Sequence, residues 1–217
     1  SYPTQALLVI PNDLPAPNEN ASAHLAAVGD QLRDLIVASD GGLFALFTSH
    51  RDVREMASQM RDAGYDARWP LLVHGEEPRD VLLQRFRDSG RAVLIGTATF
   101  WEGVDVPGDA LRGLLIAKLP FRVPTEPMVA AQCEAIEARG GNAFGEFMLP
   151  HASLRLKQGF GRLIRTATDR GVVVISDPRV LTKRYGREML SGLPPARRIS
   201  GPWSRCRAEV RKFYTEH

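Results

Sequence analysis

The stretch that decides the fold reads QGFGRLIR at residues 158–165 and, after a short polar loop, GVVVISD at residues 171–177. The first part is predicted to form a helix, and the unbroken apolar run of the second is typical of a buried strand. In a helix, residues three and four apart are neighbours, so Gln158, Arg162 and Arg165 would share one face. Two guanidinium groups on one face suit a polyanion such as a nucleotide phosphate. The stretch therefore predicts an α/β domain in which a phosphate-binding helix leads into the sheet.

Strand-like and helix-like segments alternate along the rest of the chain. The predicted strands are Ala6–Ile10, Leu43–Thr48, Leu71–His74, Ala92–Thr97, Leu111–Leu119 and Gly171–Ser176. The predicted helices are Ser22–Ser39, Arg51–Ala63, Arg79–Asp88, Thr125–Arg139, His151–Arg165 and Trp203–Tyr214. This alternation is typical of βαβ units and predicts a mainly parallel sheet flanked by helices. We expect one domain over residues 1–217, with a helical excursion at 121–150.

The composition is that of an ordinary globular chain. Of its 217 residues 44% are hydrophobic and 24% charged, and the net charge of +3 permits a nucleic-acid partner without requiring one. The two cysteines and five histidines are scattered and show no metal-ligand spacing, so we expect no metal site in this chain. Free cysteines favour a reduced, cytoplasmic setting. No apolar run is long enough to span a bilayer, so no membrane partner is expected.

Ligands of parallel sheets bind where the strands end, which directs attention to the loops that follow strands. Three segments stand out: Thr48–Arg51, Thr97–Pro107 and the segment before Arg162. Threonine hydroxyls in such loops are typical contacts for a phosphate backbone. We expect the aromatic residues Phe100 and Trp101 to pack in the core rather than to stack on a base.

Five stretches, in the same order along the chain, resemble the motifs of the DinG/XPD-like superfamily 2 DNA helicases. They are Ala6–Pro17, Leu46–Ser49 (motif IV), Thr99–Asp105 (motif V), Lys118–Phe121 with Pro124 and Pro127 after it, and Gln158–Arg165 (motif VI). The first and fourth resemble the bacterial DinG branch in particular. One such match would be weak, but five in order span nearly the whole chain.

The resemblance implies the second of two RecA-like motor domains. No G-x-x-x-x-G-K-[ST] loop occurs in the chain, so it carries no P-loop of its own. ATP and Mg²⁺ would be held mainly by the first motor domain of the same protein, and the isolated chain is predicted to be inactive. An iron–sulfur cluster, where relatives have one, belongs to the first domain and not to this chain.

The resemblance also implies roles for residues on the nucleotide side. Arg162 and Arg165 would be arginine fingers that reach the γ-phosphate across the cleft, with Gln158 helping to place the attacking water or the phosphate. The motif V residues expected to line the same cleft are Glu102, Gly103 and Asp105. Without the resemblance, the arginines would be interpreted as part of a solvated helix face with ion pairs to acidic neighbours.

On the DNA side, the residues expected to bind a single strand are Thr48, Ser49, His74, Thr97 and Thr99. His74 stands where relatives often have glutamine, and a histidine can still donate one hydrogen bond. The basic residues near the C-terminus, Arg197-Arg198 and the Arg205–Lys212 cluster, suit either DNA phosphates or a solvated surface.

The function predicted is therefore that of the C-terminal motor domain of a bacterial, cytoplasmic, ATP-dependent DNA helicase, an ATP hydrolase that moves along single-stranded DNA and separates strands. One alternative is a non-catalytic helicase-like module that binds single-stranded DNA or a protein partner. A stand-alone Rossmann-like enzyme is disfavoured because no G-x-G-x-x-G follows the first strand.

Overall fold

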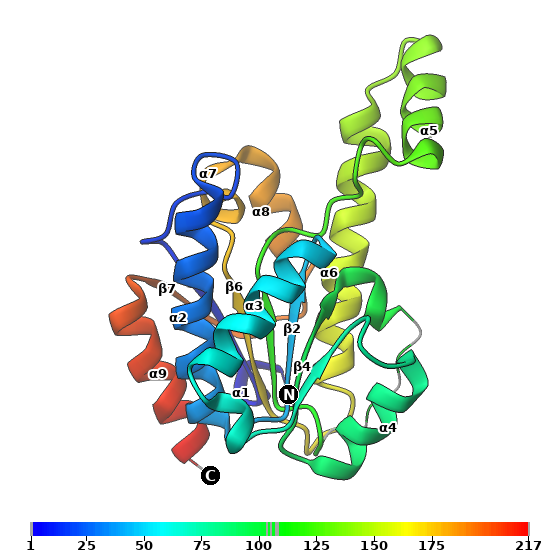
Figure 1. The fold of residues 1–217 in the computed structure, drawn as a ribbon. Helices are drawn as coiled ribbons and strands as arrows, with labels where there is room; N and C mark the ends of the chain where they lie inside the picture. Colours follow the sequence, from blue (N-terminus) through cyan, green and yellow to red (C-terminus); the bar gives the residue numbers. More distant parts are fainter. Residues whose placement is uncertain (1, 103, 105, 107–108, 217) are drawn as a thin grey trace.

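The centre of the fold is a seven-stranded sheet (Figure 1). The computed structural model describes residues 2–102, 104, 106 and 109–216. The strands are β1 (Ala6–Pro11), β2 (Leu43–Phe47), β3 (Leu71–Val73), β4 (Val93–Thr97), β5 (Gly113–Ile116), β6 (Gly171–Ile175) and β7 (Arg197–Gly201). Their order is β3-β4-β2-β5-β6-β1-β7, and every pair is parallel. The predicted α/β fold with a mainly parallel sheet is confirmed.

Helices cover both faces of this sheet. The α-helices are α1 (Tyr2–Gln5), α2 (Ala21–Ser39), α3 (His50–Asp62), α4 (Arg79–Ser89), α5 (Pro127–Ala138), α6 (Leu149–Leu163), α7 (Arg179–Thr182), α8 (Arg184–Ser191) and α9 (Trp203–Thr215). Three short elements complete the list: the 3₁₀ turns η1 (Tyr65–Ala67) and η2 (Ala98–Trp101) and the π-helix η3 (Phe144–Met148).

Alternate strand residues enter two separate cores. In β1, Leu8 and Ile10 belong to the core that also holds residues of α4, α6 and α8, whereas Leu7 and Val9 belong to the core with residues of α2, α3 and α9. Both faces of the strands are therefore apolar, which explains their unbroken hydrophobic runs. Phe100 is buried in the first core, as predicted. The side chain of Trp101 lies outside the described part of the chain.

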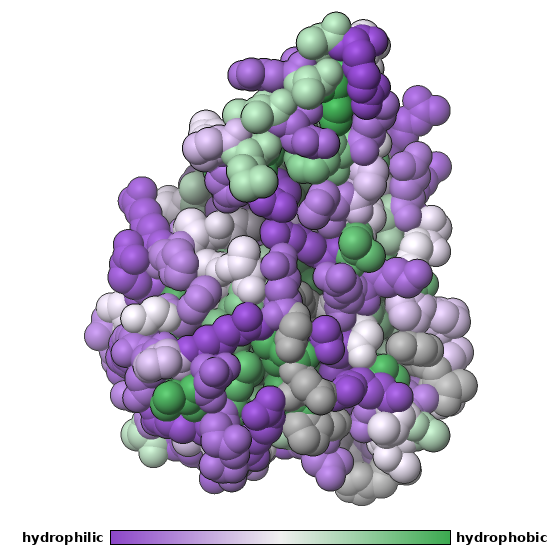
Figure 2. Space-filling model, turned by 90° about the vertical axis from the view of Figure 1, so that its right-hand side faces the viewer, coloured by the Kyte–Doolittle hydropathy of each residue, from purple (hydrophilic) through white to green (hydrophobic). Residues whose placement is uncertain are grey.

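The segment between β5 and β6 forms an arm that projects beyond the sheet. In Figure 1, α5 and the first part of α6 rise away from the body of the molecule. Figure 2 shows pale green, moderately hydrophobic residues among hydrophilic ones on this arm, and Met128 is 84% exposed. Rings of Phe121, Phe144 and Tyr185 pack together with centroids 5.3–5.7 Å apart, so the arm is joined to α8 by aromatic contacts.

A buried ion pair holds the root of the arm. Asp177, fully buried at the end of β6, accepts hydrogen bonds from Nε and Nη2 of Arg179 at 3.0 and 2.6 Å. The same carboxylate accepts from the backbone N–H of Leu119 at 2.8 Å. Burial alone would lower the pKa of Arg179, but the Asp177 carboxylate outweighs it and raises that pKa. One carboxylate thus links the loops that follow β5 and β6.

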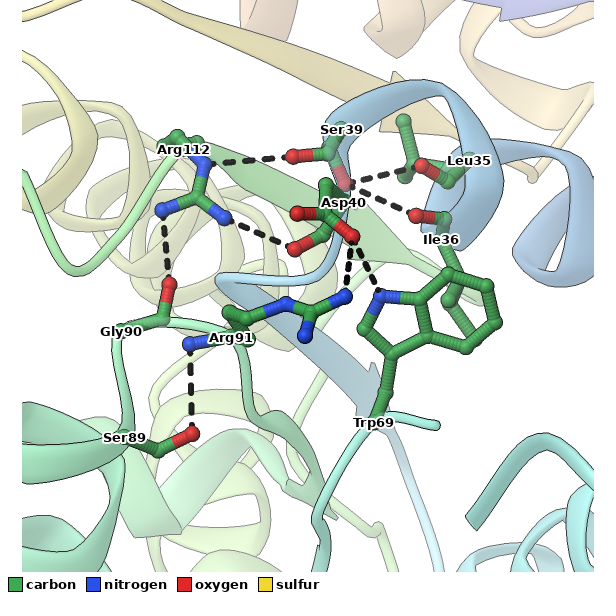
Figure 3. Close-up of polar contacts among 9 residues, drawn as sticks. All are labelled: Leu35, Ile36, Ser39, Asp40, Trp69, Ser89, Gly90, Arg91 and Arg112. Atoms are coloured by element: carbon green, nitrogen blue, oxygen red, sulfur yellow. Dashed lines mark hydrogen bonds and ion pairs between the residues drawn. The ribbon is translucent and has the colours of Figure 1, made fainter. Parts of the chain in front are cut away.

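A second polar cluster lies at the opposite end of the sheet (Figure 3). The Arg112 guanidinium donates to the backbone carbonyls of Ser39, Asp40 and Gly90 at 3.2, 2.9 and 2.8 Å. These carbonyls end α2 and α4, and Arg112 itself precedes β5. Gly42 has φ +68°, and a Cβ at this position would lie 2.8 Å from Cζ of Arg112, so the approach requires glycine. The cluster therefore fixes three loops that are distant in sequence.

Arg112→Ala is expected to lower the free energy of unfolding of the chain by about 2–3 kcal/mol, because charge-assisted hydrogen bonds to several carbonyls are lost. Urea unfolding followed by circular dichroism measures this change. The matched control is Arg197→Ala, which removes an exposed ion pair with Glu209 and should cost no more than about 1 kcal/mol. Equal losses in the two variants would contradict the structural role of Arg112.

Two sequence predictions need correction, and one strand was not predicted. The helix predicted to continue to Arg165 ends at Leu163, where Ile164 adopts extended backbone. The basic pair Arg197-Arg198 belongs to the unpredicted edge strand β7, where Arg197 pairs with Glu209. The predicted strand over Leu111–Leu119 is limited to Gly113–Ile116. Among the residues that the structure describes, no helix is both long enough and apolar enough to cross a bilayer.

Candidate functional site

Three of the predicted DNA contacts form one hydrogen-bonded group at the ends of β3 and β4. The backbone N–H of Thr97 donates to Nδ1 of His74 at 3.2 Å, and the hydroxyl oxygens of Thr97 and Thr99 are 2.8 Å apart. Because Nδ1 accepts, the ring proton of a neutral His74 resides on Nε2. The group thus combines an imidazole donor with the exposed hydroxyl of Thr99.

The environment of His74 favours its neutral form. Burial is the main cause that lowers its pKa below the ordinary value, and the nearby His50 and Arg79 lower it further. The rings of His74 and His50 lie 4.7 Å apart. His74 therefore offers a neutral hydrogen-bond donor rather than a positive charge.

The other two predicted DNA contacts follow β2. Ser49 is the N-cap of α3, and its hydroxyl oxygen accepts from the backbone N–H of Asp52 at 3.1 Å. The hydroxyl of Ser49 keeps its own proton as a donor. Thr48 is half-buried and faces a pocket. All five predicted contacts thus lie at the carboxyl ends of three neighbouring strands.

The pocket beside them has a volume of about 200 Å³. Its lining includes Thr48, Thr97 and Thr99 and, from the root of the arm, Phe121 and Arg122. Hydroxyl, aromatic and cationic side chains thus share one pocket. Such a lining suits a ligand with a phosphate and an apolar part.

Arg155 also lines this pocket, although it was not among the residues predicted from the sequence. It comes from α6, and its side chain is only 11% exposed. Its Nη2 donates to Oε1 of Glu102 at 3.0 Å. The sequence spacing could have identified Arg155, because it precedes Arg162 by seven residues, which is about two helical turns on the same face.

The two arginines predicted as fingers lie at the far end of α6. Arg162 is half-exposed in its last turn, and Arg165 lies beyond the helix end. Arg165 is therefore not on a shared helical face with Gln158 and Arg162, contrary to the prediction. Gln158 is exposed one turn before Arg162.

Arg165 is held from both its backbone and its side chain. Its N–H donates to Oδ2 of Asp169 at 2.8 Å, and its Nη1 donates to the carbonyl of Val106 at 3.2 Å. Asp169 also accepts from the N–H of Thr166 at 2.7 Å. Burial raises the pKa of Asp169, but these backbone donors outweigh it and hold that pKa below its usual range. Asp169, missed in the sequence, thus stays ionised and fixes the Arg165 main chain.

The remaining predicted residues belong to motif V. Gly103 and Asp105 lie outside the described residues. Glu102 is described, and besides the ion pair with Arg155 its carbonyl accepts from Arg79. Its carboxylate therefore borders the hydroxyl-lined pocket. Across the described ranges, no group of three or more His, Cys, Asp or Glu side chains is arranged to hold a metal ion.

Those predicted residues that the structure describes thus fall into two groups. The hydroxyl group lies at the carboxyl ends of β2, β3 and β4. Arg165 instead lies in the loop that leads from α6 to the amino end of β6. Helix α6 connects the groups, because Arg155 and Arg162 are about 10 Å apart along its axis.

Comparisons with known proteins show the family to which the chain belongs. A family profile described as helicase C-terminal domain matches residues 32–196. The chain is 46% identical over 197 residues to the ATP-dependent DNA helicase YoaA of Escherichia coli, covering 91% of this chain and 30% of YoaA. It is 38% identical over 209 residues to the ATP-dependent DNA helicase DinG of Photobacterium profundum, covering 91% of this chain and 29% of DinG.

Among solved structures, apo XPD superposes with a TM-score of 0.69 at 18% identity, covering 92% of this chain and 40% of XPD. This likeness confirms the predicted RecA-like helicase fold. The chain spans less than a third of the length of these two curated relatives.

Proposed function

The chain belongs to the family of helicase C-terminal domains, as its motifs predict, and on that premise we propose that it is the second motor domain of an ATP-dependent DNA helicase. The intact protein would couple ATP hydrolysis to movement along single-stranded DNA and to strand separation in the bacterial cytoplasm. The observation that carries the proposal is helix α6, which links a hydroxyl-lined edge at Arg155 to the arginines near its other end.

On the nucleotide side, Arg162 and Arg165 would contact the γ-phosphate of ATP held by the first motor domain of the same protein. Guanidinium groups fit a phosphate because they present several donors in a fixed plane. The fixed backbone of Arg165 supports this role, since a finger must be positioned before charge develops. Gln158, Gly103 and Asp105 are proposed to line the same cleft.

The chain's own residues do not suffice to hold ATP and Mg²⁺. It has no P-loop, and two arginines without a phosphate loop form half of such a site. When bound, Mg²⁺ would neutralise phosphate charge, and the residues of this chain would add guanidinium donors. An iron–sulfur cluster, if the intact protein has one, would likewise belong to another domain.

On the DNA side, Thr48, Ser49, Thr97, Thr99 and His74 would contact the backbone of a single strand. Neutral hydroxyl and imidazole donors suit phosphate oxygens and carry no base preference. This agrees with movement along DNA of any sequence.

The isolated chain of residues 1–217 is expected to show no ATP hydrolysis, with or without single-stranded DNA. The reason is that it lacks the phosphate loop and the acid that holds Mg²⁺. Phosphate release is the measurement, and the intact protein is the positive control. DNA-stimulated turnover by the isolated chain would contradict its assignment as a second motor domain, and an inactive intact protein that still binds DNA would favour the non-catalytic module.

A further inference from the structure

We propose that Arg155 and Arg122 bind a backbone phosphate of single-stranded DNA in the pocket at the root of the arm, and that Glu102 and Glu126 hold these guanidinium groups until DNA displaces them. The inference rests on the proposed function and adds two phosphate-binding residues and their internal competitors. None of the helicase motifs contains Arg122 or Arg155.

The first observation is the position of Arg155. It is less exposed than Arg122, with 11% of its side chain exposed against 28%, and it lines the same pocket as Thr48 and Thr99. Its Nε is buried and has no hydrogen-bond partner among the described residues. A buried donor without a partner is costly, and a phosphate oxygen would satisfy it. The guanidinium is therefore arranged for an acceptor that enters from the pocket.

The second observation is that each pocket arginine is paired with an exposed glutamate. Arg155 pairs with Glu102 at 3.0 Å, and Arg122 pairs with Glu126 at 3.5 Å. About half of each glutamate side chain is exposed. Each carboxylate remains partly in solvent, which weakens its attraction to the arginine, so a polyanion can replace the carboxylates. A phosphodiester in the pocket would take both guanidiniums and release both glutamates to solvent.

The third observation is the chemistry of the remaining wall. Pro120, Phe121 and Val123 present apolar surface beside the two arginines. A nucleotide unit of a strand offers the matching combination of a charged phosphate and an apolar sugar or base face. The pocket lies at the carboxyl ends of the strands, away from Arg165, which favours the DNA strand over ATP as the source of the phosphate.

The experiment uses the intact protein and a fluorescently labelled oligothymidylate, with affinity measured by anisotropy over a range of KCl concentrations. Arg155→Gln is expected to weaken binding roughly five- to tenfold, because a charge-assisted contact to phosphate is lost. The slope of log affinity against log salt should become shallower by about 0.7, the value for one phosphate contact on a single strand. A merely structural arginine would not change this slope. Arg122→Gln changes a more exposed arginine than Arg155, should act in the same direction, and serves as the test if Arg155→Gln fails to fold.

Glu102→Gln is expected to act in the opposite direction and to strengthen oligothymidylate binding about two- to fivefold, since the internal competitor is removed. The gain should vanish in the Glu102→Gln/Arg155→Gln double variant, because there is no guanidinium left to release. The matched control is Glu209→Gln, which frees Arg197 on the opposite edge of the sheet and changes the net charge equally. It should leave binding unchanged.

Three results would overturn the inference. The gain of Glu102→Gln could persist without Arg155, which would mean that only repulsion of DNA by the carboxylate was relieved. The arginine variants could bind oligothymidylate like the parent protein, which would remove the phosphate contact while leaving the motor assignment intact. They could instead weaken binding of a fluorescent ATP analogue alone, which would assign the pocket to nucleotide. A parent protein that binds no oligothymidylate would remove the inference and the proposed function together.

Discussion

Arg165→Ala in the intact protein is expected to lower ATP turnover by a factor of about 10³–10⁵, the range found when an arginine finger is removed from phosphoryl-transfer enzymes. The loss arises because charge that develops on the transferred phosphoryl group is no longer met by a fixed guanidinium. Affinity for oligothymidylate should stay nearly constant, since Arg165 lies near the amino end of β6 and away from the hydroxyl-lined edge. Steady-state phosphate release and anisotropy measure the two quantities separately.

The control for this variant is Arg187→Ala, an exposed arginine of α8 that does not line the hydroxyl-lined pocket. Its turnover should match that of the parent protein. Arg165→Lys should restore only a small part of the activity, because an ammonium cannot reproduce the planar set of donors. Turnover by Arg165→Ala within a factor of a few of the parent would exclude Arg165 from the finger role and leave Arg162 as the candidate.

The alternation of apolar strands with amphipathic helices was sufficient to predict the sheet and most helices. It failed for β7, whose residues Arg197–Gly201 are mostly polar because the strand lies at an edge and its side chains face solvent. It also failed at the end of α6. There the backbone leaves the helix at Ile164 and places the N–H of Arg165 on Asp169, a contact that local propensity does not reveal.

The site was predictable only in part, because contacts between residues that are distant in sequence leave no local pattern. Motif order located the hydroxyl residues, and a seven-residue spacing could have located Arg155. The sequence gives no sign that Arg155 meets Glu102, because the two are 53 residues apart and come together only in the folded chain. Likewise, the carbonyl partners of Arg112 belong to the loops after α2 and α4. These loops come close to Arg112 only because of the order of the strands in the sheet.

Asp177→Ala is expected to be the most destabilising change in this chain, with a loss of about 3–5 kcal/mol in the free energy of unfolding. Removing one member of a buried pair leaves the Arg179 guanidinium, itself largely buried, without its counter-charge. It also leaves the N–H of Leu119 without its acceptor. Urea unfolding of the 217-residue chain measures the loss, and the exposed Asp66→Ala should change stability by no more than about 0.5 kcal/mol. A loss as small as that of the control would show that the pair contributes little.

A second substitution separates the effect of the unpaired Arg179 charge from the effect of the lost acceptor for the Leu119 N–H. In the Asp177→Ala/Arg179→Met variant the unpaired charge is gone, so stability should return in large part, because buried pairs can often be replaced by apolar side chains. The recovery of stability should be incomplete, since the N–H of Leu119 still lacks an acceptor.

The double variant also removes the Arg179 guanidinium, which lies 5.8 Å from the ring centroid of Phe121 and is one contact between the end of β6 and the arm. Because Phe121 and Arg122 line the pocket at the arm root, a refolded double variant should bind oligothymidylate more weakly than the parent even where its stability has recovered. Full recovery of stability without any change in DNA affinity would mean that the arm root needs no ion pair to hold its orientation.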